Sequence, residues 1–242
     1  MPTLPAKQQI ENNVYSKLRS ILLVCGVLSS LLYVIMNIVT AILYEGYSPV
    51  SQTVSELSAI GAPTRPLWVA LGIGYELLVI AFAVGVWLSS KSNRPLRIAG
   101  MLLFINGVIG FFWPPMHQRP VLSAGGASLT DTLHIVFTAV TVPLMMLSIG
   151  FGAAAFGKKF RLYSIITVVI LIVFGLLTAS DGPRISANLP TPLIGLWERI
   201  NIGVYMLWVV VLAILLLRIK RQEGQTITRP SKHVTFHDMA IE

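Results

Sequence analysis

Six long apolar segments divide this chain of 242 residues and constrain its fold more than any other feature. As a helix, each is long enough to cross about 30 Å of hydrocarbon, which takes roughly 20 residues. The segments are 19–44, 66–89, 96–113, 130–156, 162–180 and 196–218. We therefore predict an all-α integral membrane protein with a bundle of six transmembrane helices.

The composition supports lipid as the solvent of these segments. Hydrophobic residues make up 55% of the chain and charged residues only 12%, whereas soluble domains carry about a quarter of their residues as charges. A chain this apolar has too little polar surface to cover a soluble globule, so membrane lipids are its expected partners. Because Cys25 is the one cysteine, an intrachain disulfide and a thiolate metal cluster are excluded.

The basic residues predict the orientation of the bundle. The net charge is +8, but the basic residues flank the apolar segments instead of forming a stripe, so we expect no nucleic-acid partner. Fourteen of the 18 lysines and arginines lie at the two ends of the chain (up to residue 19 and from residue 218 onwards) or in and beside the two short connections (residues 91–97 and 158–161). The positive-inside rule then gives an N-in/C-in topology, with both termini in the cytoplasm.

We divide the chain into three parts. Residues 1–18 form a cytoplasmic N-terminal tail, and residues 19–218 form the transmembrane domain. Residues 219–242 form a polar cytoplasmic tail without helical periodicity, which we interpret as disordered, with His233 and His237 solvated rather than ligating. The first apolar run is too long for a signal-peptide core, so we expect it to be retained.

The three outer connections are long and rich in proline, glycine, serine and threonine. The first contains Thr53 and Glu56 at the spacing of a capping box, with Val54, Leu57 and Ile60 at helical spacing. This pattern predicts a short amphipathic helix that lies across the mouth of the bundle. Because the three loops share one side of the membrane, they are where we expect a functional site.

Four motifs in these outer regions carry a family resemblance. In order they are SPVSQTVSELSAIGAPTRPLW, FFWPPMHQR, LTDTLHIVFT and ISANLPTPLIGLWERI. Together they resemble the bacterial membrane family catalogued as domain of unknown function 998, and the likeness covers nearly the whole chain except both tails. The resemblance implies a multi-pass fold in a bacterial plasma (inner) membrane and no established activity.

A looser likeness is to the intramembrane hydrolases related to alkaline ceramidases and adiponectin receptors. Those proteins combine seven helices with a serine, an aspartate and several histidines around zinc. The same residue types stand here at Ser55, His117, Asp131 and His134. The chain departs from that pattern in having six apolar segments and no His-x-x-x-His on the last one, so the most diagnostic ligand pair is missing.

The start of the fourth apolar segment carries the candidate metal ligands. Thr130 is a suitable N-cap, which places Asp131 in the first helical turn and His134 on the same face. His117, in the preceding loop, can fold back to meet them, and imidazole nitrogens with a carboxylate oxygen suit zinc. The alternative is that Asp131 caps the helix and His134 hydrogen-bonds within the bundle.

Two residues of the first outer loop complete the candidate catalytic set. Ser55 is a nucleophile only if a base lies beside it. Glu56 either completes the helix cap or points inward as a base or ligand. The candidate catalytic residues are Ser55, Glu56, His117, Asp131 and His134.

Charged side chains at the outer side give a candidate substrate-binding set. Its members are Arg65, Arg119, Asp181, Arg184, Glu198 and Arg199. A guanidinium holds a phosphate or carboxylate through two parallel hydrogen bonds, so the arginines are candidates for an anionic head group. The alternative is a structural network of ion pairs with the nearby acids. Because adjacent residues do not face each other on a helix, we expect Glu198 and Arg199 to pair elsewhere.

Glu76 stands apart, because it lies inside an apolar segment. At 1.5 Å per residue it is roughly 15 Å deep, where a charged carboxylate costs at least ~2.5 kcal/mol. We expect it to face the bundle interior near Asn37, Tyr75 or Asn106. It is either a proton-carrying or substrate-binding acid, or a protonated hydrogen-bonding link between helices.

Three functions fit these features. The first is an outward-facing enzyme, such as a metal-dependent hydrolase, that binds or hydrolyses a lipid or an anionic head group. The second is a non-enzymatic ligand-binding or accessory membrane protein. The third is a small proton-coupled transporter that uses Glu76.

Overall fold

Nine helices make up the part of the chain that the structure describes. In this computed structural model that part is residues 6–228, with side chains described for residues 13–220 and for Gln222. The six long helices are α1 (Ala6–Leu43), α2 (Arg65–Ser89), α3 (Arg94–Gly110), α5 (Leu129–Ala155), α6 (Lys158–Ser180) and α8 (Ile194–Thr228). The three short ones are the 3-10 helix η1 (Val54–Ser58), α4 (Arg119–Ser123) and α7 (Gly182–Ser186). No strand is formed by the described residues, so the all-α prediction is confirmed.

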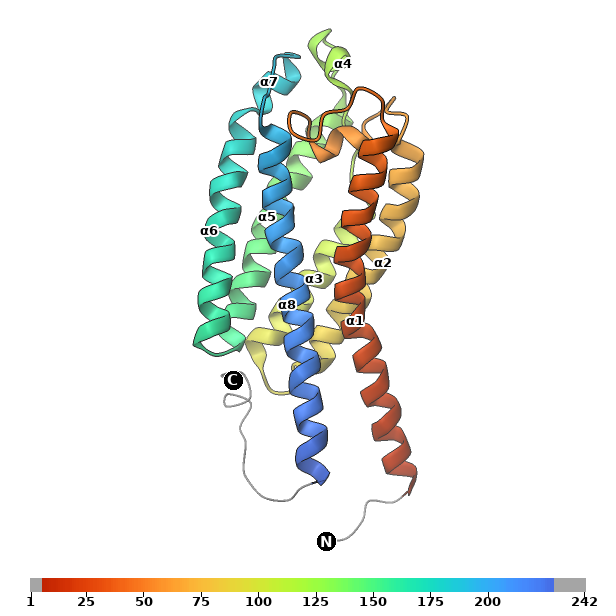
Figure 1. Ribbon diagram of the computed structural model, residues 1–242, viewed down its shortest axis with the longest axis vertical. Helices are drawn as coiled ribbons and strands as arrows, with labels where there is room; N and C mark the ends of the chain where they lie inside the picture. Colours follow the sequence, from red (N-terminus) through yellow and green to blue (C-terminus); the bar gives the residue numbers. More distant parts are fainter. Residues whose placement is uncertain (1–5, 229–242) are drawn as a thin grey trace.

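The six long helices form a closed ring (Figure 1). Each packs against the long helix that precedes it in the chain, and α8 returns to pack against α1. The first residue of α1 and the last residue of α8 therefore lie at the same end, together with the short connections after α2 and α5. The three long connections, with α4 and α7, lie at the opposite end, which we call the loop end (Figure 1).

Five of the long helices, all except α3, are long and apolar enough to cross a membrane. The chain is thus a multi-pass membrane protein. The remaining helix, α3, has 17 residues, which at 1.5 Å per residue gives about 26 Å against ~30 Å of hydrocarbon. It nevertheless fills the place between α2 and α5 in the ring. The sixth crossing and the N-in/C-in topology stay predictions.

Two helices extend beyond the predicted apolar runs. α1 begins at Ala6 instead of residue 19, and α8 continues to Thr228 instead of ending at residue 218. The segment 219–228, which was expected to be disordered, is therefore helical. An apolar run marks the length that suits lipid, whereas a helix ends only where its backbone hydrogen bonds stop. His233 and His237 lie outside the described residues.

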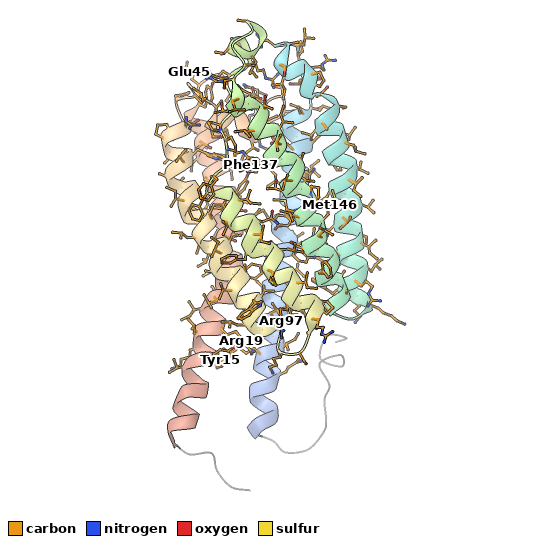
Figure 2. All side chains as sticks on the ribbon, turned by 180° about the vertical axis from the view of Figure 1, so that it is seen from behind. Tyr15, Arg19, Glu45, Arg97, Phe137 and Met146 are labelled. Atoms are coloured by element: carbon orange, nitrogen blue, oxygen red, sulfur yellow. The ribbon has the colours of Figure 1, made fainter. Side chains whose placement is uncertain are left out.

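The two ends of the ring carry different side chains (Figure 2). Tyr15, Arg19 and Arg97 lie towards the end with the short connections, whereas Glu45 lies at the loop end. The two labelled arginines thus lie at the end that the positive-inside rule would assign to the cytoplasm.

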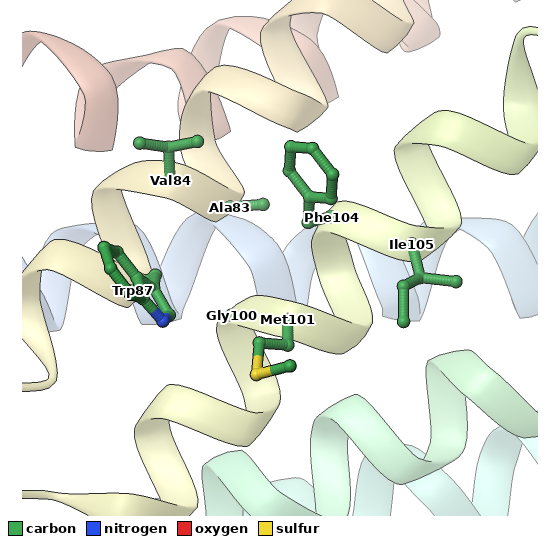
Figure 3. Close-up of a pocket in the computed structure, with 7 residues that line it drawn as sticks. All are labelled: Ala83, Val84, Trp87, Gly100, Met101, Phe104 and Ile105. Carbon is green, nitrogen blue, oxygen red and sulfur yellow. The ribbon is translucent and has the colours of Figure 1, made fainter.

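The outer surface of the ring is apolar. α6, for example, exposes Leu162, Ile165, Val169, Ile172 and Leu176 along its length. An apolar groove of about 280 Å³ lies between α2 and α3 (Figure 3). Its lining consists of Ala83, Val84, Trp87, Gly100, Met101, Phe104 and Ile105. With no polar side chain except the indole at its rim, the groove suits a lipid chain and offers no group for chemistry.

Large side chains fill the interior on the side away from the loop end. Trp208 of α8 is fully buried, and its indole Nε1 donates a hydrogen bond to Ser164 Oγ of α6 at 3.0 Å. Gly152 of α5 leaves room for this indole, since a Cβ on Gly152 would lie 2.6 Å from it. This contact set ties α5, α6 and α8 together and leaves the polar side chains of interest nearer the loop end.

Candidate functional site

The three long connections converge at the loop end. Arg119 of the second connection reaches Glu56 in the first connection and Thr191 in the third. The backbone N–H of Ile60 also donates to the carbonyl of Met116 at 2.8 Å, which joins the first and second connections directly. The connections therefore form one folded cap over the ring, which we call the loop cap (residues 44–64, 111–128 and 181–193).

Glu56 is the main hydrogen-bond acceptor of the loop cap and is only 4% exposed. Its carboxylate accepts from Nε and Nη2 of Arg119 at 2.7 and 2.9 Å. It also accepts from the backbone N–H and the hydroxyl of Thr53 at 2.7 and 3.0 Å. The predicted capping box is confirmed, and the helix behind it is η1. Because both carboxylate oxygens are occupied, the geometry favours a structural role over that of a general base.

Arg119 makes all its hydrogen bonds within the loop cap. Besides the pair with Glu56, Nη1 donates to Thr191 Oγ1 at 2.8 Å and Nη2 donates to the carbonyl of Ser51 at 3.1 Å. A guanidinium has five N–H donors in a fixed fork, and here the fork is surrounded by protein acceptors. The structural-network alternative therefore describes Arg119 better than a role in binding a head group.

Arg199 is held in the same manner. It donates through Nη2 to the hydroxyl of Tyr47 at 2.6 Å, through Nη1 to the carbonyl of Pro49 at 2.7 Å, and through Nε to Asn37 Oδ1 at 3.2 Å. The neighbouring Glu198 accepts instead from the first backbone N–H of η1. The two residues thus pair elsewhere, as their adjacency predicts, and together they attach α8 to the loop cap.

The other members of the predicted substrate-binding set stand outside this network. Arg184 Nε lies 3.8 Å from Asp181 Oδ1, and its side chain is exposed. Arg65 donates through Nη1 to the carbonyl of Ser58 at 2.6 Å, and the described part of the chain provides its guanidinium with no other acceptor. Most N–H donors of Arg65, which lies beside η1, therefore have no protein acceptor among the described residues.

Asp131 fixes the start of α5. The N-cap is Ser128 and not the predicted Thr130, because only Ser128 has an acidic residue three positions later that can complete a capping box. Thr130 would need Leu133 in that role. The Asp131 carboxylate also accepts from the backbone N–H of His117 at 2.6 Å and lies 2.8 Å from its Nδ1. As expected, His117 folds back to the start of this helix, and Asp131 also serves as a cap.

His134 faces Ser55. Its Nδ1 lies 2.7 Å from the carbonyl oxygen of Pro114, which can accept only from a protonated nitrogen. Trp113 Nε1, 3.2 Å from the same Nδ1, is also a donor, so both contacts cannot be hydrogen bonds, and the shorter one decides the tautomer. Nε2 is then an acceptor, 3.1 Å from Ser55 Oγ. A hydroxyl beside the free lone pair of an imidazole is the arrangement of an activated nucleophile.

The three predicted metal ligands do not form one site. His134 contacts Ser55 and Pro114, whereas His117 and Asp131 contact each other. In the part of the chain that the structure describes, no group of three or more His, Cys, Asp or Glu side chains is placed to hold a metal ion. We therefore assign no zinc ligands, and Ser55 with His134 is the candidate reactive pair.

Glu76 lies below the loop cap, inside α2. Its carboxylate rests against Gly110 of α3, where an added Cβ would lie 2.1 Å from Oε1. The expected partners Asn37 and Asn106 make no hydrogen bond to it among the described residues, and Asn37 accepts from Arg199 instead. Glu76 thus packs against α3 without the expected asparagine partners, and it takes no part in the loop-cap network.

Three partners of these residues were not identified from the sequence. Tyr47 and Thr191 accept from the two partly buried arginines Arg199 and Arg119, and Trp113 lies edge to face against the ring of His134 with centroids 5.4 Å apart. A buried guanidinium needs several acceptors, so polar residues of the long loops were the available signal for the first two. No local pattern links Trp113 to His134, because a whole loop separates them.

Comparisons with known proteins agree with this architecture and bring no activity. A family model described as "Protein of unknown function (DUF998)" matches residues 27–215. That range includes the whole loop cap and at least part of every long helix. Curated proteins give no match, and solved structures give none either.

Proposed function

The chain belongs to the family described as a protein of unknown function (DUF998), and we propose that it is a membrane hydrolase with Ser55 as nucleophile and His134 as general base. The observation that carries the proposal is the 3.1 Å contact between Ser55 Oγ and His134 Nε2. The Pro114 carbonyl supports it, because it keeps the proton on Nδ1 and leaves Nε2 free to accept one.

The reaction follows from this tautomer. Ser55 Oγ attacks the carbonyl carbon of an ester while its proton passes to His134 Nε2. The tetrahedral adduct collapses, the ester C–O bond breaks, and the leaving alcohol takes the proton from Nε2. Water, deprotonated by the same nitrogen, then attacks the acyl group on Ser55. The products are an alcohol and a carboxylic acid, and Ser55 is restored.

The surroundings of Ser55 favour an ester-linked lipid as substrate. The serine lies in η1 at the end of an apolar ring, where a lipid head group meets the protein. Arg65 donates to Ser58 in the same short helix and keeps further N–H groups for a phosphate. An acyl lipid with an anionic head group would fit this place: its chains can lie against the apolar surface of the helices, and its head group can accept from the N–H groups that Arg65 does not use.

Two further residues act by positioning. Asp131 lies three residues before His134 in α5 and binds both Ser128 and His117, so it fixes the turn that carries the base. His117 holds that carboxylate from the other side. Neither contacts His134 through a hydrogen bond, so the orienting group of this proposed pair is a backbone carbonyl and not a carboxylate.

A fluorophosphonate probe tests the proposal, because it labels only serines with an activated hydroxyl. We expect the detergent-purified protein to be labelled, Ser55→Ala to lose all labelling, and His134→Asn to lose most of it. Ser58→Ala is the matched control, since Ser58 lies in the same helix and its hydroxyl donates to the carbonyl of Ser55; it should label like the wild type. Equal labelling of wild type and Ser55→Ala would sink the assignment.

A second candidate function is a non-enzymatic binding or accessory protein. It is favoured by Arg119 and Arg199, whose donors are taken up by protein acceptors in a cap that holds the helices together. In that case Ser55→Ala lowers the thermal stability without affecting any turnover. If the wild type releases fatty acid from phosphatidylglycerol and Ser55→Ala does not, the protein is a hydrolase and this second candidate function is wrong.

A further inference from the structure

The interior of the ring contains an acid without a cationic partner. Glu76 lies 11 residues into α2, about 16 Å along the helix at 1.5 Å per residue. Among the described residues, no lysine, arginine or histidine pairs with its carboxylate, and no hydrogen bond reaches it. A carboxylate at this depth needs either a proton or a counter-charge.

A second polar group near Glu76 is also unsatisfied. Asn106 of α3 is 8% exposed, and both its amide nitrogen and its amide oxygen are buried without a hydrogen-bond partner. Asn106 and Gly110 are four residues apart, so they share one face of α3. Gly110 is the residue that the Glu76 carboxylate touches. The carboxylate and the amide therefore lie one helical turn apart along the same contact between α2 and α3.

Three tyrosines lie in the part of the core next to this position. Tyr33 of α1 and Tyr75 of α2 have ring centroids 5.1 Å apart. Both rings pack against the buried core cluster that contains Tyr205 of α8, and Tyr75 directly precedes Glu76 in the chain. Aromatic faces attract a cation through their ring quadrupole, and the attraction grows when water is excluded. We call Glu76, Asn106, Tyr33, Tyr75 and Tyr205 the inner polar cluster.

We propose that the inner polar cluster binds a compact organic ammonium ion within the ring. The Glu76 carboxylate supplies the counter-charge, the Asn106 amide oxygen accepts an N–H, and the tyrosine rings provide apolar, cation-attracting walls. An alkali metal ion prefers several oxygen ligands in a closed shell and gains less from aromatic faces. The proposal does not depend on the Ser55–His134 pair, which lies where the loop cap meets α5.

Titration calorimetry on the full chain in detergent tests this site with methylammonium chloride against sodium chloride at equal ionic strength. We expect saturable binding of about one methylammonium per chain and no comparable heat with sodium. Glu76→Gln should weaken the binding at least tenfold. Glu45→Gln, at an exposed acid of the loop end, is the matched control and should bind like the wild type.

Asn106→Leu provides an independent readout. Replacing a buried amide that has no partner with an apolar side chain of similar size should raise the thermal midpoint, yet weaken methylammonium binding at least threefold. A purely structural asparagine would not combine these two effects. Equal heats for sodium and methylammonium, unchanged binding in Glu76→Gln, or unchanged binding in a folded Asn106→Leu would each overturn the proposal.

Discussion

Arg119 donates hydrogen bonds through Nε and Nη2 to both oxygens of the Glu56 carboxylate, at 2.7 and 2.9 Å, although 63 positions separate the two residues. The pair is largely buried, with side-chain exposures of 12% and 5%. It connects the first and second outer connections, and through Thr191 the third. This ion pair is thus one of the main links among the three connections of the loop cap.

We predict that Arg119→Ala destabilises the protein by about 3–5 kcal/mol, because it leaves the buried Glu56 carboxylate without its counter-charge. The free energy of unfolding can be measured by reversible denaturation in mixed micelles. Arg184→Ala is the control: its pair with Asp181 spans 3.8 Å at an exposed site, and such pairs contribute roughly 0–1 kcal/mol. Equal losses for the two variants would contradict the central role of Arg119.

At Gly100 of α3 the structure has no room for a side chain. A Cβ there would lie 2.9 Å from the backbone nitrogen of Trp87, so Gly100→Ala must push α3 away from α2. Such overpacking typically costs about 1–3 kcal/mol. Gly150→Ala, where a Cβ meets nothing within 4 Å, should be neutral or slightly stabilising, since alanine favours helix. Thermal melts that rank the two variants in the opposite order would show that α2 and α3 do not approach as closely as described.

The Trp208 indole allows a test of the interior away from the loop cap. Ser164→Ala removes the acceptor of a fully buried N–H, and an unsatisfied buried donor costs roughly 1–3 kcal/mol. Ser180→Ala should have little effect, because the Ser180 hydroxyl is exposed and bonds only to a carbonyl of its own helix. Tryptophan fluorescence during unfolding reports both variants, and an unchanged midpoint for Ser164→Ala would contradict the contact.

Local patterns in the sequence were enough to predict the helices and the caps. Roughly 20 apolar residues in a row specify a membrane helix whatever its neighbours are, and a capping box is a contact over three residues, as at Thr53 and Glu56. The same locality explains the error at Thr130. Two neighbouring hydroxyl residues could each start α5, and only the reciprocal contact with Asp131 selects Ser128.

The pairing of distant residues could not be predicted from the sequence. Ser55 and His134 are 79 positions apart, and nothing in either segment specifies which of the nearby acids or histidines the serine meets. The sequence likewise did not distinguish Arg119 from Arg65, because the number of acceptors around each guanidinium depends on how three loops fold together. Candidate residues were therefore identified, but their pairing needed the fold.

Tyr47 gives the loop cap a dependence on alkaline pH. Burial raises its pKa to about 12, against the opposing effect of the Arg199 guanidinium. The unfolded chain loses this proton near pH ~10, so the contribution of the neutral hydroxyl to stability is complete below pH ~10 and is lost as the pH rises towards 12. The difference in thermal midpoint between wild type and Tyr47→Phe should thus shrink from pH 9 to pH 11. A constant difference would show that the hydroxyl titrates normally.

Thiol labelling tests the orientation of the ring. In a Cys25→Ala background, single cysteines at Ser92 and Ala127 occupy exposed positions in the short connection after α2 and in the second outer connection. Because the basic residues cluster around the short connections, the positive-inside rule places Ser92 on the cytoplasmic side. In intact cells, a membrane-impermeant maleimide should label the cysteine at 127 and not the one at 92, and inverted membrane vesicles should reverse the result. Labelling of both from the same side would mean that α3 does not cross the membrane, and labelling in the reverse order would mean that the ring is inserted the other way round.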